Sequence, residues 1–157
     1  VQDGQPICGV LHAPALGETY AAEAGAGARL GGAPIHVGAK AELEGCALLS
    51  DAQMIRHASW PTPWPEDMRV ESRNSVAYRM ALVAAGAFDA VLALSSKCDW
   101  DLAAADLIVR EAGGVCTDHH GRPFVYNQAS TRKPSLVCAA PALHQLIIGR
   151  VDHIELK

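Results

Sequence analysis

The first part of the chain alternates between apolar and polar positions, a pattern that predicts paired β-strands. Residues 6–13 and 18–24 are expected to form two strands separated by a turn, and Gly31-Gly32 separates two shorter strands that follow. Glycine accepts the positive backbone angles that tight hairpin turns require. We therefore expect two successive hairpins in residues 1–40.

From residue 41 onward, short apolar runs alternate with segments of helical periodicity. Continuous apolar runs bounded by turn residues are typical of buried strands, and apolar residues at helical spacing predict amphipathic helices. This order predicts an α/β fold, in which a mixed sheet is flanked by helices and preceded by β-hairpins. A boundary near 38–44 would separate a hairpin segment, 1–40, from an α/β domain, 41–157. Strands are expected at 46–49, 68–72, 88–94, 115–117, 123–125 and 135–139, and helices at 75–85, 100–112 and 141–150.

The most informative segment is residues 98–114, where Trp100-Asp101 opens a strongly helical run that ends at a pair of glycines. An aspartate at a helix start can cap free backbone N–H groups, and its carboxylate can also bind a divalent cation. The three consecutive alanines at 103–105 leave room for a close neighbour on one face of this helix. The glycines end the helix because they tolerate the left-handed conformation found at many helix ends.

Two loop-to-helix junctions lie where open α/β sheets bind their ligands. Arg73-Asn74-Ser75 leads into one predicted helix, and Lys97 precedes the helix that carries Asp101. A helix N-terminus offers unpaired N–H groups and a partial positive charge, which suit a phosphate. Arg73 and Lys97 are candidates for pairing with phosphate, with solvated surface cations as the alternative. Ser75 is a candidate for substrate contact, with a simple helix cap as the alternative.

A proline-rich stretch, Trp60-Pro61-Thr62-Pro63-Trp64-Pro65, cannot form a regular helix because proline lacks the backbone donor. We expect a surface loop, whose two tryptophans either form a stacking platform or pin the loop to the core. The second of these alternatives is favoured. His119-His120 is expected in an exposed turn, since turn-forming residues flank it.

Composition narrows the class of protein. The chain has 157 residues, 50% of them hydrophobic, which fits one globular domain. The net charge is −4 and no basic patch appears, which argues against nucleic acid as a partner. No apolar run reaches the roughly 18 residues of a membrane span, and no leader pattern is visible. The five cysteines contain no Cys-x-x-Cys, so we expect reduced thiols and a cytoplasmic location.

Residues 98–114 resemble the C-terminal signature of the inositol monophosphatase family, which comprises magnesium-dependent phosphatases. The glycine-rich hairpin at 25–28, followed by Ile35-His36-Val37, is a second match to that family. The resemblance implies the C-terminal part of a layered αβαβα sugar-phosphatase fold. It also implies Mg²⁺ as cofactor, with Asp101 as a metal ligand.

The resemblance further implies a substrate site at the first junction. The family carries Gly-Ser or Gly-Thr there; Ser75 matches, whereas Asn74 replaces the glycine. Arg73 and Lys97 complete the expected substrate-binding residues. The implied activity is phosphomonoester hydrolysis of a small phosphorylated metabolite, with inositol monophosphate as the default. Inositol-specific members carry a glutamate where this chain has Ala93, so a 3′(2′),5′-bisphosphate nucleotidase is the alternative.

One aspartate does not make a magnesium site, since several oxygen ligands are needed. The family's other ligands come from a glutamate on an earlier helix and from an Asp-Pro-Leu/Ile-Asp-Gly-Thr segment, and neither is found in these 157 residues. We therefore expect a C-terminal portion that lacks most metal ligands and is inactive by itself. A non-catalytic remnant that serves as a scaffold is the alternative. Apolar edges left uncovered would favour a homodimer or other self-association.

Overall fold

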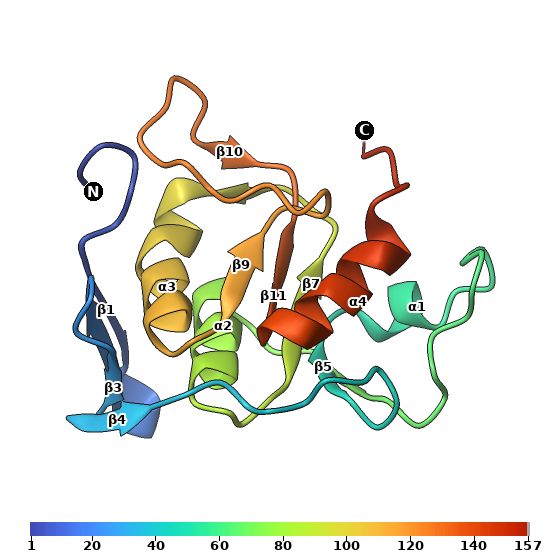
Figure 1. Cartoon of the computed structure of the whole chain (residues 1–157), viewed down its shortest axis with the longest axis horizontal. Coiled ribbons are helices and arrows are strands. Elements are labelled where there is room, and N and C mark those ends of the chain that lie inside the picture. The colour runs from blue at the N-terminus through green and yellow to red at the C-terminus, as the bar shows by residue number, and fades with distance from the viewer. Residues whose placement is uncertain (157) are drawn as a thin grey trace.

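A computed structural model describes residues 1–156 and arranges them in layers (Figure 1). An antiparallel sheet at the N-terminal side packs against two helices, which in turn cover one face of a mixed sheet. A third long helix covers the opposite face of the mixed sheet. This confirms the predicted α/β class, with a mixed sheet flanked by helices and preceded by antiparallel strands.

The N-terminal sheet has the strand order β1-β2-β3-β4 and is antiparallel throughout. A short 3-10 turn, η1, connects the first two strands, and Gly31-Gly32 connects the last two, which confirms the two predicted hairpins. The bounds are β1 Cys8–Ala13, η1 Pro14–Leu16, β2 Glu18–Glu23, β3 Ala28–Leu30 and β4 Ala33–Ile35.

The mixed sheet has the strand order β6-β5-β7-β11-β9, in which β5 runs parallel to both of its neighbours and β11 antiparallel to both of its own. Its strands are β5 Ala47–Leu49, β6 Arg69–Glu71, β7 Ala90–Ala93, β9 Val115–Thr117 and β11 Leu136–Ala139. The helices are α1 Ala52–Ile55, α2 Val76–Ala84, α3 Asp99–Glu111 and α4 Pro141–Val151.

The core lies on both faces of this sheet because successive residues of a strand point to opposite sides. In β7, Val91 packs among the buried residues of α2 and α3. Ala90 and Leu92 pack on the other face, with Leu143 and Ile147 of α4. A strand that is buried on both faces has a continuous apolar run, which is the pattern that predicted it. No helix within residues 1–156 is long and apolar enough to cross a membrane.

Three parts of the sequence prediction were wrong. Lys97–Cys98 was expected in a loop, but forms a short strand, β8, that pairs with β10, Arg132–Lys133. Residues 123–125 were expected as a strand of a hairpin, but only Pro123 forms a single bridge. The turn around His119 is present, yet His119 is buried rather than exposed. Its ring nitrogen forms a hydrogen bond with Ser135 Oγ at 2.7 Å.

Helix α3 approaches β1 closely at the alanine-rich stretch. A Cβ atom placed on Gly9 would lie 2.9 Å from the carbonyl oxygen of Ala104 and 3.0 Å from its Cα. Those contacts involve backbone atoms, which cannot move aside as a flexible side chain can. The room that the three alanines were predicted to leave is therefore filled by the backbone of β1.

The other end of α3 is tied to the same sheet. The carboxylate of Glu111 accepts hydrogen bonds from the backbone N–H groups of Gly25 and Gly27, each at 2.9 Å. These two hydrogen bonds lower the pKa of the Glu111 carboxyl. The ionised glutamate thus holds the turn between β2 and β3 onto the end of the helix.

Replacing Gly9 should destabilise the fold. We expect Gly9→Ala to lower the free energy of unfolding by about 1–3 kcal/mol, because the new methyl group overpacks the α3 backbone. Gly149→Ala is the control, since a Cβ there meets nothing within 4 Å; it should be neutral or stabilising by up to about 1 kcal/mol. Urea unfolding followed by circular dichroism measures both. Equal effects would contradict the close approach.

Glu111 should make stability depend on pH. Its folded-state pKa lies below the unfolded value, so the ionised form stabilises the fold above the unfolded pKa and is lost as pH falls through the folded one. At pH 7, Glu111→Gln should lower the free energy of unfolding by about 0.5–1 kcal/mol, and the difference should shrink below about pH 4. Glu44→Gln, at an exposed position, is the control. A pH-independent difference would exclude this role.

Candidate functional site

The first junction, at the start of α2, is an exposed turn with an unusual backbone. Ser75 has a φ of 61°, a left-handed value that few residues other than glycine adopt. Its Oγ accepts a hydrogen bond from the N–H of Tyr78 at 3.3 Å, so Ser75 caps the helix. Asn74, which stands where the family has glycine, is not among the residues with positive φ and lies exposed to solvent.

Arg73, at the same junction, already has partners. Its guanidinium donates to Glu71 Oε2 at 2.7 Å and lies 5.9 Å from the centre of the Phe88 ring. The Arg73 side chain is half exposed. The structure therefore gives Arg73 an ion pair at the surface.

The second junction places Asp101 in the first turn of α3. The helix begins at Asp99, so Asp101 is its third residue, and its Oδ2 accepts from the N–H of Cys98 at 3.0 Å. The cap is formed from within the helix, which begins one residue earlier than the predicted start at residue 100. No hydrogen bond to the other carboxylate oxygen is found within residues 1–156, which leaves Oδ1 available to a ligand.

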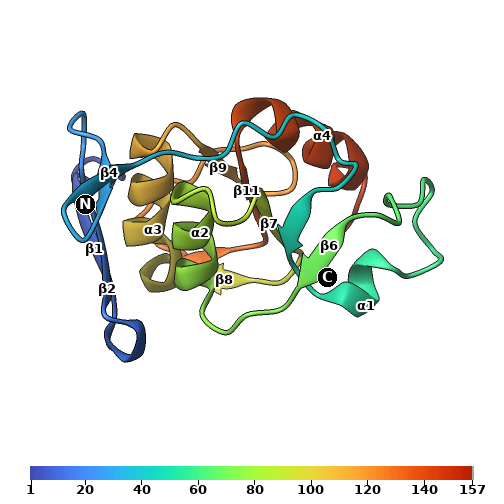
Figure 2. The same ribbon diagram turned by 90° about the horizontal axis from the view of Figure 1, so that it is seen from below.

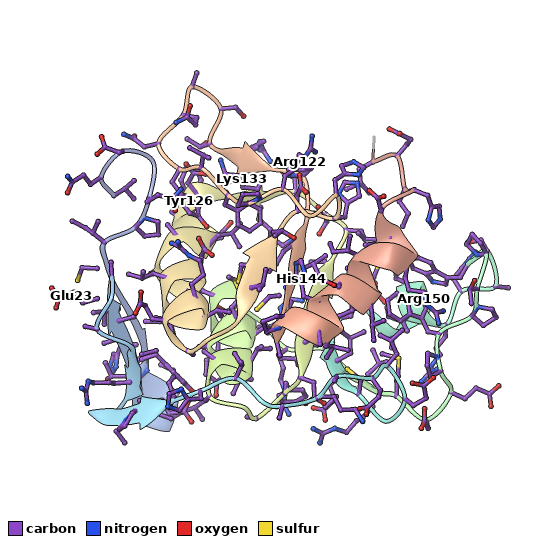
Figure 3. The ribbon with its side chains drawn as sticks, viewed as in Figure 1. Glu23, Arg122, Tyr126, Lys133, His144 and Arg150 are labelled. Atoms are coloured by element: carbon purple, nitrogen blue, oxygen red, sulfur yellow. The ribbon has the colours of Figure 1, made fainter. Side chains whose placement is uncertain are left out.

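The neighbouring acidic residues are engaged inside the protein. Asp99 pairs with Lys133 Nζ at 3.0 Å, and Lys133 lies beside Tyr126 (Figure 3). Asp106, only 2% exposed, accepts from the Tyr126 hydroxyl at 3.0 Å and pairs with Arg110 Nε at 3.3 Å. Burial raises the pKa of the Asp106 carboxyl. These carboxylates hold α3 to the segment around Tyr126.

Lys97 lies close to Asp101 and to a second cation. Its Nζ donates to the carbonyl of Ser95 at 2.7 Å and to Ser95 Oγ at 2.6 Å, and so holds the loop that connects β7 to β8. Partial burial lowers the pKa of the Lys97 ammonium, the positive charge of Arg79 lowers it further, and Asp101 opposes the shift. Lys97 therefore sits in an electrostatically positive environment.

Arg79 is the residue that the sequence analysis missed. It lies one turn beyond the helix cap, where its N–H donates to the Ser75 carbonyl at 3.1 Å. Its buried Nε has no hydrogen-bond partner, and no ion pair to its guanidinium is found within residues 1–156. Burial lowers the pKa of Arg79. A charged residue four positions after Ser75, on the same helix face, was the available signal.

Arg79 and Ser95 line a common cavity. This cavity, of about 190 Å³, is also lined by Ala93, Asp51, Met54, Leu92 and Leu94. Figure 2 shows the entry into α2, strand β8 and helix α1 along one edge of the molecule. Asp51, the acidic residue of this lining, caps α1 by accepting from Gln53 N at 2.8 Å, and no ion pair between it and Arg79 is found within residues 1–156. The cavity thus contains an arginine that has no ion pair among the described residues and whose buried Nε is free to donate to an anion.

The described residues do not make a metal site by themselves. Within residues 1–156, no group of three or more His, Cys, Asp or Glu side chains could hold an ion. Magnesium is bound through one or two carboxylates, several waters and substrate phosphates in octahedral geometry. Asp101 fits the role of one such carboxylate, but one ligand is too few to form the site.

A model of the inositol monophosphatase family matches residues 1–156. The chain belongs to the inositol monophosphatase family. It is 31% identical to a fructose-1,6-bisphosphatase/inositol-1-monophosphatase of Thermotoga maritima, over 98% of this chain and 58% of that protein. It is 32% identical to the 3′(2′),5′-bisphosphate nucleotidase CysQ of Aggregatibacter actinomycetemcomitans, over 82% of this chain and 49% of that protein.

Solved structures show the same inositol monophosphatase fold. The Thermotoga maritima IMPase superposes with a TM-score of 0.80 at 31% identity, covering 97% of this chain and 58% of that one. The chain thus spans about half to three-fifths of the length of the relatives that it matches. The junctions described above belong to the part of the family's fold that this chain contains.

The unpaired charge of Arg79 should weaken the fold when no anion is bound. We expect Arg79→Met to leave the free energy of unfolding unchanged or to raise it by about 1 kcal/mol, because a partly buried charge without an ion pair adds no stability and its buried Nε lacks a hydrogen bond. Arg110→Met is the matched control, and it should destabilise the protein by about 1–3 kcal/mol, since it removes the ion pair of buried Asp106. Urea unfolding without phosphate compares them. Equal losses would make Arg79 a structural residue.

Proposed function

We propose that this chain forms the substrate-binding part of a phosphomonoesterase that acts on a small phosphorylated metabolite. Membership of the inositol monophosphatase family supports the reaction class. The observation that carries the proposal is the cavity beside the start of α2, which is lined by Arg79 and by Ser95, the residue that the Lys97 ammonium holds. An anion that enters would gain a charge-assisted hydrogen bond from the unpaired guanidinium.

Each residue has a distinct part in this proposal. Ser75 and the free N–H groups of the first turn of α2 would orient a phosphate at the helix end. Arg79 and Lys97 would neutralise its charge, and the Lys97–Ser95 hydrogen bonds would keep the loop in place. Asp101 would be one carboxylate ligand of the Mg²⁺ that the family resemblance implies, with the remaining ligands coming from outside the described residues. Arg73 and Asn74 would flank the entrance.

The substrate that we favour carries a second anionic group. A mono-phosphorylated inositol needs acceptors for its hydroxyl groups, and Ala93, which lines the cavity, offers none. Two neighbouring cations instead suit a further phosphate. The similarity to a 3′(2′),5′-bisphosphate nucleotidase supports this choice. We therefore propose 3′-phosphoadenosine 5′-phosphate ahead of inositol monophosphate.

Phosphate release in the presence of Mg²⁺ tests the activity. The assay uses the 157-residue chain and a longer protein that adds the segment which relatives carry outside the match. In the longer protein, Asp101→Asn should lower kcat at least about 100-fold, because a metal ligand is lost. The same change should leave the fold intact, since asparagine still accepts from Cys98. Glu44→Gln is the control.

Substrate preference is read from the same assay. Arg79→Met should raise KM for 3′-phosphoadenosine 5′-phosphate about 10- to 100-fold, and by less for inositol 1-phosphate. The 157-residue chain is expected to show no turnover. If the longer protein hydrolyses neither compound, the phosphatase proposal fails and the scaffold alternative stands.

A further inference from the structure

The proline-rich loop that precedes β6 is held in place by its second tryptophan. Trp64 is buried, and the guanidinium of Arg150 lies 5.6 Å from the centre of its ring. Arg150 also donates to the carbonyls of Thr62 and Pro63, at 3.1 and 2.8 Å. Figure 3 shows Arg150 extending from α4 toward this loop. Trp64 therefore pins the loop, as the favoured prediction held.

The first tryptophan has a different position. Trp60 is only partly buried, and its indole N–H donates to the carbonyl of Met54 at 2.7 Å. Its ring meets Trp64 edge to face, with centroids 5.4 Å apart and an interplanar angle of 88°. The hydrogen bond and the ring contact fix the orientation of the Trp60 side chain. A ligand that contacts its ring would therefore not have to order this side chain first.

Trp60 lines a second cavity that adjoins the cationic one. This cavity, about 210 Å³, is bounded by Trp60, Pro61 and Leu94, together with Ser59, His153 and Ile154. Leu94 lines both cavities, and Met54, which accepts the indole N–H, lines the cationic cavity. The pocket that Arg79 lines and an aromatic, largely apolar pocket thus lie side by side.

We propose that Trp60 is a specificity-determining residue, on whose ring the base of a nucleoside phosphate stacks while its phosphate binds Arg79 and Lys97. This rests on the proposed function, because it takes the anion site at Arg79 as given. Charge complementarity selects the phosphate end of the ligand. The aromatic and apolar lining selects a flat, π-bonded group at the other end. The hydroxyl groups of an inositol would lose their hydration there with few acceptors to replace it.

The test measures binding to the 157-residue chain by calorimetry, with 3′-phosphoadenosine 5′-phosphate and inorganic phosphate as probes. Trp60→Leu should raise the Kd for the nucleotide at least about fivefold, because base stacking is lost. Its Kd for inorganic phosphate should change less than about twofold. Trp60→Phe keeps an aromatic ring and should retain most of the nucleotide affinity. Thr62→Ala, in the same loop, is the matched control.

The outcomes separate the two proposals. If Trp60→Leu binds the nucleotide as tightly as the unchanged chain does, the stacking role is wrong and the anion site stands. If Trp60→Leu weakens only the nucleotide while Arg79→Met weakens neither probe, the anion site is wrong and the stacking role stands. If the unchanged chain binds neither probe, both proposals fail. Circular dichroism of each variant shows whether it is folded.

Discussion

The close approach of α3 to β1 is the constraint on which the arrangement of the site depends. Gly9 and Ala104 allow the two backbones to meet, and Glu111 ties the far end of the helix to the turn between β2 and β3. On its other side α3 packs against α2 within the same core. Because the helix is held on both sides, its first turn, with Asp101, has a fixed position relative to the first turn of α2.

Three cations of this chain stabilise the fold through ion pairs. Lys133, Arg110 and Arg122 each pair with an aspartate that is largely buried, at 3.0, 3.3 and 2.7 Å. Arg79 differs from these three cations, since it is partly buried and no ion pair to its guanidinium is found within residues 1–156. A protein gains no stability from such a charge. Arg79 lines a cavity, and we propose that its charge serves ligand binding there.

The spacing of apolar residues predicted α2, α3, α4 and the continuous apolar strands. In these elements the buried face requires apolar residues at regular positions, so the sequence carries the pattern. Strands β8 and β10 were missed because two-residue strands have no periodicity, and their pairing joins Cys98 to the distant Arg132. The sequence placed Asp101 near a helix start, and the structure adds that its carboxylate accepts from the N–H of Cys98. Arg79 was missed because a sequence reveals a charge but not whether that charge has a partner. The two tryptophans of the proline-rich loop proved to differ, Trp64 pinning it and Trp60 lining a cavity.

Nuclear magnetic resonance of the arginine Nε–H groups, during titration with inorganic phosphate, tests the central claim most directly. The Arg79 resonance is assigned by its absence from the Arg79→Met variant. The account predicts that this resonance shifts saturably with phosphate, while that of Arg110, paired with Asp106, stays in place. Electrostatic binding also predicts that added salt weakens the shift. An Arg79 resonance that does not respond to phosphate, or one that moves no more than Arg110, would contradict the anion site.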